Sequence, residues 1–243
     1  MKTATNTLVI GCLLVGHFSF AQLKNNLETK ELKVEETTFY YHHSNIDSKA
    51  AVILFHDWFG VSDLSYEMAE RITSSGMNVY IIDLYKGKSA KTNQEAQGLM
   101  NTIDQGRMWY YIDQVLKEAK TSHEKIYLWG FSLGTFPASE TAIRNNEAID
   151  ALVLFYGNVT QDKERLKKID FPTLMVMGAK DNPQGAIDYY KNVTEVGGSA
   201  TLFIYPNARH AFAQKLFNAG GNYDENAKEA SLDVAFRFLE EIK

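Results

Sequence analysis

One serine in the chain stands at a position suited to nucleophilic attack. Ser132 is the central residue of the sequence GFSLG at 130–134, with an apolar run at 126–129 before it and a helix-compatible stretch at 135–144 after it. A strand that turns abruptly into a helix holds its corner residue in a strained conformation, and glycines on either side leave room for the turn. The sequence therefore predicts a turn that presents the Ser132 hydroxyl above a sheet.

A serine hydroxyl needs a base to take its proton, and the base needs an acid to orient it. For a nucleophile at such a turn, the expected chain order is serine, acid and histidine, each just beyond a strand. Asp181 follows the apolar run at 173–177, and His210 follows the run at 201–205. We therefore predict Ser132 as the nucleophile, His210 as the base and Asp181 as the orienting acid.

Both partners also have plainer interpretations. Asp181 suits the N-cap of a helix that begins after Pro183, and His210 suits an exposed loop. Their place in the chain order, taken together with the GFSLG motif, favours the catalytic interpretation.

An attacked carbonyl oxygen becomes negatively charged and needs hydrogen-bond donors. The backbone amide of Leu133 begins the helix after the nucleophile, and that of Trp58 lies in the loop after the apolar run at 51–55. We predict these two amides as the oxyanion hole. Gly130 and Gly134 are expected to support the nucleophile turn.

Two further residues of the early loop carry side chains that could do chemistry. Asp57 is expected to support the nucleophile loop, with a turn or capping role as its alternative. His56 is expected to be a hydrogen-bonded loop residue, because His210 has the better position for the base.

Short apolar runs alternate with amphipathic stretches along the chain. Runs that are apolar on both faces predict buried parallel strands, and they lie at 51–55, 79–82, 126–129, 151–155, 173–177 and 201–205. Helical patterns lie at 64–74, 107–120, 135–144, 185–196 and 226–242, and an early strand near one edge is expected at 37–42. We predict one α/β domain at 22–243, with an open, doubly wound, mostly parallel sheet covered by helices on both faces.

Composition narrows the classes of partner. With 45% apolar residues the chain can bury a sizeable core, and a formal net charge of −5 makes nucleic acid or an anionic membrane surface a poor partner. No group of histidines and carboxylates has metal-site spacing, so neither a metal nor another cofactor is expected.

The first residues are typical of an export signal. Lys2 precedes an apolar run at 8–20 that is too short to span a bilayer, and polar residues follow Ala21 at once. We expect a signal peptide at 1–21, no stable membrane insertion, and a periplasmic or secreted product. The alternative is a lipid anchor on Cys12, the only cysteine of the chain.

At four places the sequence resembles the dienelactone hydrolase family. The similar blocks are LFHDWFG at 54–60, DLY at 83–85, GFSLG at 130–134 and YPNARHAF at 205–212, within a resemblance that covers most of 50–243. The resemblance implies an α/β-hydrolase fold, hydrolysis through a covalent acyl-enzyme without a metal, and a nucleophile, acid and base at Ser132, Asp181 and His210. It also implies that an acidic residue at the position of Asp57 helps to control the nucleophile.

The chain departs from that family in two ways. The best-known members use cysteine at the position of Ser132, and a hydroxyl depends more on its base than a thiol does. They also hold a substrate carboxylate with arginines at positions that look like Gly87 and Gln214 here. Nearby cations, which are better interpreted as solvated surface charges, are Lys86, Lys88, Arg107 and Arg209.

Taken together, these patterns predict a serine hydrolase that acts on a small ester or lactone. Aromatic residues that could line its pocket, or could simply belong to the core, are Trp58, Phe59, Trp109, Tyr110 and Phe136. Alternatives are an acyl hydrolase for thioesters or peptides, because the same site attacks any activated acyl group, and a non-catalytic binding protein on the same fold. The sequence leaves the oligomeric state open.

Overall fold

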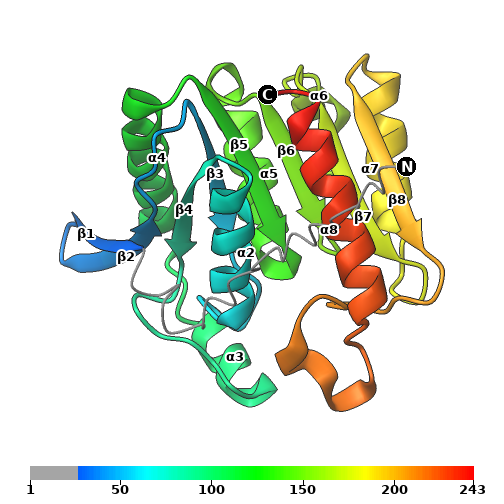
Figure 1. Cartoon of the computed structure of the whole chain (residues 1–243), viewed down its shortest axis with the longest axis horizontal. Coiled ribbons are helices and arrows are strands. Elements are labelled where there is room, and N and C mark those ends of the chain that lie inside the picture. Colours follow the sequence, from blue (N-terminus) through cyan, green and yellow to red (C-terminus); the bar gives the residue numbers. More distant parts are fainter. Residues whose placement is uncertain (1–26) are drawn as a thin grey trace, which may run out of the picture.

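A single eight-stranded sheet forms the centre of the molecule (Figure 1). The computed structural model describes residues 27–243. The strands are β1 (Glu28–Val34), β2 (Thr37–His43), β3 (Ala50–Phe55), β4 (Asn78–Asp83), β5 (Lys125–Phe131), β6 (Ala151–Phe155), β7 (Thr173–Gly178) and β8 (Ala200–Tyr205). Their order across the sheet is β1-β2-β4-β3-β5-β6-β7-β8. The pairs from β4 to β8 are parallel, and β1 and β2 form an antiparallel hairpin that joins β4.

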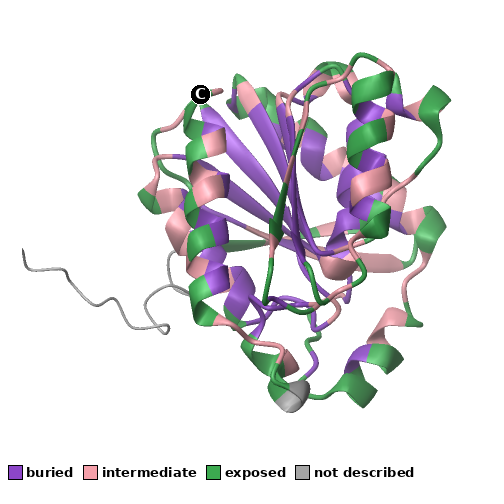
Figure 2. Ribbon diagram, turned by 90° about the vertical axis from the view of Figure 1, so that its right-hand side faces the viewer, coloured by how far each residue is buried: buried purple, intermediate pink, exposed green. Residues whose placement is uncertain are grey.

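Every residue of β3, β4, β6 and β7 is buried, as expected for parallel strands with both faces covered (Figure 2). The early strand expected near an edge is β2, which is second from the edge. The edge itself is β1, a strand that no apolar pattern predicts, because its sequence, ETKELKV, is largely charged and mostly exposed.

The run at 201–205 is a strand, β8, but the prediction that it is buried on both faces is wrong. It lies at the other edge of the sheet, and Phe203 is 40% exposed. Among the described strands only β7 pairs with it, so its apolar sequence reflects strand propensity as much as burial.

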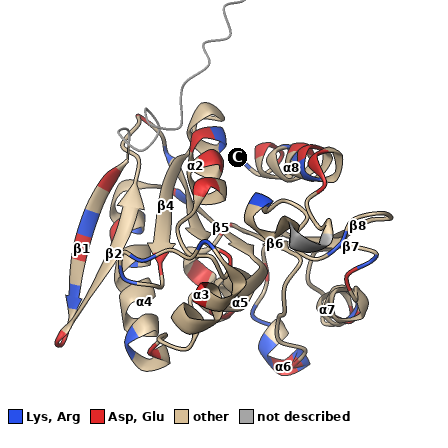
Figure 3. Cartoon of the chain, turned by 90° about the horizontal axis from the view of Figure 1, so that it is seen from below, with Lys and Arg blue, Asp and Glu red and all other residues tan. Residues whose placement is uncertain are grey.

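Helices cover both faces of the sheet, as predicted. They are α2 (Asp63–Ser74), α3 (Asn93–Met100), α4 (Gln105–Ser122), α5 (Thr135–Arg144), α6 (Lys163–Leu166), α7 (Gln184–Glu195) and α8 (Glu225–Glu240). Figure 3 shows α2 and α8 on one face and α4, α5 and α7 on the other. A nearly buried ion pair joins α2 to α8, with Lys228 Nζ 2.7 Å from Glu67 Oε2. The helix α3 was not predicted, and it lies near the carboxyl ends of the strands (Figure 1).

The turn between β5 and α5 passes very close to other backbone. A Cβ atom added to Gly134 would lie 2.4 Å from the carbonyl oxygen of Phe55 in β3, and one added to Gly130 would lie 2.5 Å from the carbonyl oxygen of Gly134. Real Cβ atoms do not approach backbone oxygen so closely, so both positions need glycine. The two glycines therefore let the turn sit directly on the end of β3.

The predicted signal peptide at 1–21, with Cys12, lies outside the described residues. Within 27–243, no helix has the length and apolar character needed to cross a membrane.

The close approach at Gly134 predicts a large cost for a single methyl group. Gly134→Ala should destabilise the protein by about 1–3 kcal/mol or more, because the backbone of β3 cannot move aside as a flexible side chain would. Urea unfolding monitored by circular dichroism measures this change.

Gly98→Ala is the matched control. Gly98 lies inside α3 with no atom within 4 Å of its added Cβ, so the same change should be neutral or stabilise by up to about 1 kcal/mol. Equal stabilities of the two variants would show that the contact at Gly134 does not constrain the fold.

Candidate active site

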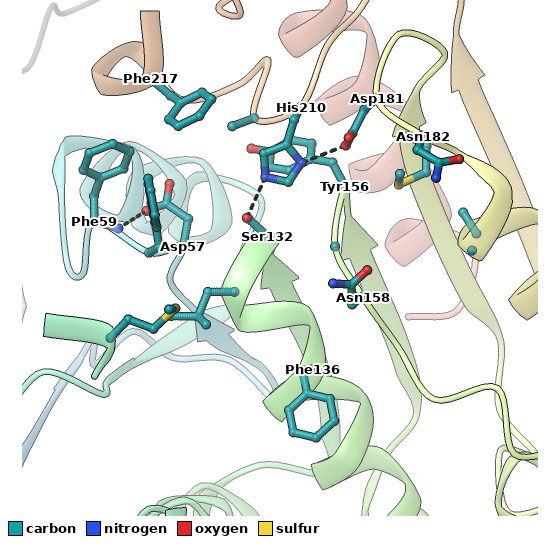
Figure 4. A pocket seen from close by; sticks show the side chains of 18 residues that line it. Asp57, Phe59, Ser132, Phe136, Tyr156, Asn158, Asp181, Asn182, His210 and Phe217 are labelled. Carbon is teal, nitrogen blue, oxygen red and sulfur yellow. Dashed lines mark hydrogen bonds and ion pairs between the residues drawn. The ribbon is translucent and has the colours of Figure 1, made fainter. Parts of the chain in front are cut away.

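Ser132, His210 and Asp181 meet at the carboxyl ends of their strands (Figure 4). The Ser132 Oγ lies 2.9 Å from His210 Nε2, and His210 Nδ1 lies 2.7 Å from Asp181 Oδ2. With Asp181 ionised, the proton on Nδ1 is donated to the carboxylate. Nε2 is then free to accept the proton of the Ser132 hydroxyl.

The backbone of Ser132 is strained. Its φ is 47°, a left-handed value that non-glycine residues rarely adopt. The residue stands between β5 and a 3₁₀ turn at Ser132–Gly134 that continues into α5. The strained corner turns the hydroxyl out of the sheet toward the pocket, as the motif predicted.

The alternative roles of Asp181 and His210 are not the ones that the structure shows. The residue before α7 is Pro183, and the nearest side-chain acceptor for its first turn is Asn182, whose Oδ1 lies 3.4 Å from the Gln184 amide. The Asp181 carboxylate instead binds His210. The His210 side chain is 38% exposed but is not a free loop residue, because both ring nitrogens are hydrogen-bonded.

Aromatic rings hold the imidazole of His210 from two sides. The Tyr156 ring meets it edge-on at a centroid distance of 5.6 Å, and the Phe217 ring does so at 6.1 Å. The side-chain amide of Asn222 also donates to the His210 carbonyl oxygen at 3.0 Å. These contacts restrict the ring to the orientation that faces Ser132.

The two amides predicted as an oxyanion hole both belong to residues that line the pocket. Among the described residues, neither the Leu133 amide nor the Trp58 amide donates a hydrogen bond. The Tyr85 hydroxyl donates to the carbonyl oxygen of Trp58 at 2.9 Å and fixes that peptide. Both N–H groups are therefore free to bind a ligand oxygen.

Asp57 is buried. Among the described residues, it makes no hydrogen bond to Ser132. Its Oδ1 accepts from the Phe59 amide at 2.8 Å, and its Oδ2 accepts from Gln214 Nε2 at 2.6 Å. Asp57 therefore stabilises its own turn and also joins the loop after β3 to the loop after β8. Burial raises the pKa of Asp57, while the bonds from Gln214 and Phe59 partly oppose this shift.

Gln214 was noted in the sequence only as a departure from the family pattern. Its side chain is buried, and its Oε1 accepts from the Leu216 amide at 3.1 Å, at the start of the 3₁₀ segment Lys215–Gly220. That segment carries Phe217, which packs against Trp58 at a ring distance of 6.0 Å. Gln214 therefore joins the loop after β8 to the loop after β3.

His56 is a buried, hydrogen-bonded loop residue, as expected. Its Nε2 accepts from the Leu84 amide at 3.1 Å, so Nδ1 carries the proton and donates to the Asp57 carbonyl oxygen. The ring links the ends of β3 and β4, and both of its nitrogens bind backbone atoms there and not Ser132.

The pocket above Ser132 has a volume of about 630 Å³. Apolar and aromatic side chains and two asparagines make up most of its wall, which is lined by Asp57, Trp58, Phe59, Met100, Ser132, Leu133, Phe136, Tyr156, Gly157, Asn158, Met177, Asp181, Asn182, Gly185, Ala186, His210, Ala211 and Phe217. Of the five aromatic candidates from the sequence, Trp58, Phe59 and Phe136 line it. Trp109 and Tyr110 do not, and Trp109 packs against the outer side of Phe136 at 6.3 Å.

No lysine or arginine is among these lining residues. Arg107 forms ion pairs with Glu35 and Asp104, and Lys86 lies over the ring of Phe39. Neither of these two cations lines the pocket. Gly87, one of the two positions compared with arginines in the sequence, donates its backbone amide to Asp83 Oδ2.

The described part of the chain contains no group of three or more histidine, cysteine or acidic side chains arranged to hold a metal ion. The chemistry that this site can perform with its own residues is proton transfer between Ser132 and His210, with Asp181 orienting the ring.

The sheet order, the strained serine after β5 and the order of the three residues define the class of an α/β-hydrolase. Similarity searches agree with that class. The chain matches the dienelactone hydrolase family over residues 37–243. It belongs to that family and is an ester-bond hydrolase.

Relatives of the chain come from several organisms. "Protein usf" of Aquifex pyrophilus is 31% identical over 175 residues, which cover 66% of this chain and 75% of that protein. A protein of Aquifex aeolicus named "Putative carboxymethylenebutenolidase" is 28% identical over 176 residues, covering 67% and 76%. The crystal structure of a protein named "Putative Dienelactone Hydrolase" from Klebsiella pneumoniae has a TM-score of 0.70 at 17% identity, covering 87% of this chain and 97% of that one.

The raised pKa of Asp57 predicts a pH-dependent effect on stability. Because the folded protein favours the protonated carboxyl, the contribution of Asp57 is greatest below the pKa it has when unfolded and is lost as pH rises through its folded pKa. Relative to Asp57→Asn, the wild type should therefore lose stability as pH rises from about 3 toward neutral. Urea unfolding of both proteins across this range measures the difference.

The comparison between the two proteins removes the contribution of every other titrating group. A stability difference that stays constant with pH, or that grows in favour of the wild type as pH rises, would contradict the raised pKa.

Proposed function

We propose that this chain is an exported serine hydrolase that cleaves carboxylic ester or lactone bonds through an acyl-enzyme on Ser132. The observation that carries the proposal is the hydrogen-bonded series Ser132–His210–Asp181 at the base of a pocket, with two unused backbone amides beside it. Membership of an ester-hydrolase family supports the same reaction class.

In the first half of the reaction, His210 Nε2 takes the proton of Ser132 as Oγ attacks the ester carbonyl carbon. Asp181 holds the ring and stabilises the positive charge that forms on it. The carbonyl oxygen becomes an oxyanion and accepts hydrogen bonds from the amides of Trp58 and Leu133. His210 then gives its proton to the leaving alkoxide, and the acyl group stays on Ser132.

In the second half, water replaces the alcohol. His210 takes a proton from the water molecule as its oxygen attacks the acyl carbon, and the same two amides stabilise the second oxyanion. Collapse of that intermediate returns the proton to Ser132 Oγ and releases the carboxylic acid. The exposed edge of His210 gives water a route to the ring.

The charge of the pocket favours an uncharged substrate. Its lining contains the carboxylate of Asp181 and no lysine or arginine, so a substrate carboxylate would meet repulsion without a compensating cation. The two positions that carry arginines in the best-known family members hold Gly87 and Gln214, and Gln214 is occupied by Asp57. We therefore place neutral esters and lactones ahead of a dienelactone, which carries a carboxylate.

The nucleophile assignment predicts the behaviour of a one-atom deletion. Ser132→Ala should reduce turnover of p-nitrophenyl butyrate by at least about 10⁴-fold and abolish labelling by a fluorophosphonate probe, because within residues 27–243 no other hydroxyl is hydrogen-bonded to His210 Nε2. Ser122→Ala, a change on the exposed end of α4, is the control and should retain both activities. Steady-state kinetics and gel fluorescence measure the two outcomes.

Retention of esterase activity in Ser132→Ala would refute the acyl-enzyme, and a wild type that neither labels nor turns over esters would favour a binding protein on the same fold. Rates on matched ester, thioester, amide and carboxylate-bearing ester substrates separate the remaining reaction classes. A faster rate on the thioester or the amide would make the alternative acyl hydrolase the better description.

Export rests on the character of residues 1–21 and makes a prediction of its own. The full chain produced in a Gram-negative host should appear in the periplasm with Gln22 as its first residue, which mass spectrometry measures. Cys12→Ser should leave this product unchanged, because Cys12 lies inside the removed segment. A membrane-bound product that starts at a lipidated Cys12 would contradict it.

A further inference from the structure

One polar side chain of the pocket has no function in the reaction described so far. Asn158, in the loop after β6, lines the pocket beside Ser132 (Figure 4). Within the described residues its side-chain amide has no hydrogen-bond partner, although that amide offers two donors and one acceptor. Asn158 is exposed, so its amide can bind water in the free protein and can exchange that water for a polar group of a molecule in the pocket.

A strained backbone and close backbone contacts hold the loop that carries Asn158. The preceding Tyr156 is fully buried and has a φ of 41°, a strained value for so large a residue. At Gly157 an added Cβ would lie 2.3 Å from the Ser132 carbonyl oxygen, and the Thr135 hydroxyl lies 2.9 Å from the Asn158 carbonyl oxygen. Strain of this kind persists where the surroundings enforce it and is common at functional sites. The loop is therefore fixed directly against the nucleophile turn.

The reaction geometry shows which part of a substrate lies near this loop. The oxyanion points to the amides of Trp58 and Leu133, and the leaving oxygen must lie within reach of His210. Asn158 and Phe136 lie on the other side of Ser132 from His210 in Figure 4. Of the three groups on the ester carbonyl carbon, the acyl chain is the one left to extend toward Asn158 and Phe136.

The chemistry of these two side chains defines what acyl group fits. Phe136 offers an apolar surface to a carbon chain, and it is 44% exposed. The Asn158 amide is neutral and can donate to, or accept from, an oxygen substituent. The absence of lysine and arginine from the pocket lining argues that this substituent is itself uncharged.

We propose that Asn158 is a specificity-determining residue that binds a hydroxyl or keto oxygen on the acyl part of the substrate. The inference rests on the proposed function and narrows it to esters of hydroxy or oxo acids. Among lactones, the inference selects those that carry a further hydroxyl or keto oxygen on the acyl carbons, because the ring oxygen is the leaving atom and lies toward His210. When Ser132 Oγ bonds to the lactone carbonyl carbon, the ring C–O bond breaks, the ring oxygen takes the proton from His210, and a hydroxyacyl group remains on Ser132.

The test compares two esters that differ by one hydroxyl. The ratio of kcat/KM for p-nitrophenyl 3-hydroxybutyrate to that for p-nitrophenyl butyrate should exceed one in the wild type and fall about tenfold in Asn158→Leu, a typical effect of one neutral hydrogen bond. Asn192→Leu is the matched control, because the side-chain amide of Asn192 in α7 donates to Gln161 Oε1 and Asn192 does not line the pocket. That control should leave the ratio unchanged.

A second pair of substrates, 2-hydroxyethyl butyrate and ethyl butyrate, places the hydroxyl on the alcohol instead. The ratio for this pair should not respond to Asn158→Leu, and a response confined to this pair would overturn the acyl assignment. Equal 3-hydroxybutyrate ratios in the wild type and Asn158→Leu would overturn the role of Asn158 altogether. If circular dichroism shows that Asn158→Leu does not fold, Asn158→Ser takes its place. Serine keeps the polarity but shortens the side chain, so this variant should lower the same ratio.

These outcomes are separate from failure of the proposed function. A wild type that cleaves p-nitrophenyl butyrate, and loses that activity in Ser132→Ala, without preferring the hydroxylated ester refutes only the role of Asn158. A wild type that cleaves none of the four esters refutes both.

Discussion

The geometry of the active site depends on the close contact between the nucleophile turn and the backbones on either side of it. Gly134 rests against the end of β3, and Gly157, after β6, rests against the Ser132 carbonyl oxygen. A third glycine, Gly178, would bring an added Cβ within 2.4 Å of the Ala208 carbonyl oxygen, in the loop that carries His210. Because neighbouring loops touch through backbone atoms, small rotations of side chains cannot change the distances between them. This rigidity maintains a strained φ at Ser132 and keeps its hydroxyl within hydrogen-bond distance of His210.

Two carboxylates near His210 have different surroundings and therefore different roles. Asp181 is partly exposed and hydrogen-bonds to His210 Nδ1, where its charge stabilises a protonated ring. Asp57 is buried, its pKa is raised by burial, and both oxygens are occupied by Phe59 and Gln214. Its bond to Gln214 connects the loop with the Trp58 amide to the loop with His210. The structure thus uses one carboxylate for the imidazole and the other to join two loops.

Much of this arrangement could be predicted from the sequence because it is written in local patterns. Runs that are apolar on both faces identified the central parallel strands, and the chain order of serine, acid and histidine brought together Ser132, Asp181 and His210. The charged strand β1 was missed, since an exposed edge strand needs no apolar pattern. The edge position of β8 was also missed, because strand propensity and burial leave the same apolar sequence.

The tie between Asp57 and Gln214 shows a different limit. The two residues are 157 positions apart, and neither has a neighbouring sequence that indicates the other. The same holds for Asn158, whose place beside Ser132 follows from contacts between β6 and the nucleophile turn that no local pattern encodes. Pairings of this kind arise only when the loops after different strands meet at one edge of the sheet.

The pocket has two chemically different sides, which are built by different sets of loops. The loops after β3 and β8 contribute Trp58, Phe59 and Phe217, whose rings pack together into an apolar wall. The loops after β6 and β7 contribute the amides of Asn158 and Asn182. Ser132 follows β5, which lies between β3 and β6. The loop after β8 starts at the far edge of the sheet and crosses to the β3 side, where Phe217 meets Trp58 and Gln214 meets Asp57, so the nucleophile stands between the two walls. Variation in each set of loops can therefore change one side of the pocket while the other side and the reacting groups stay in place.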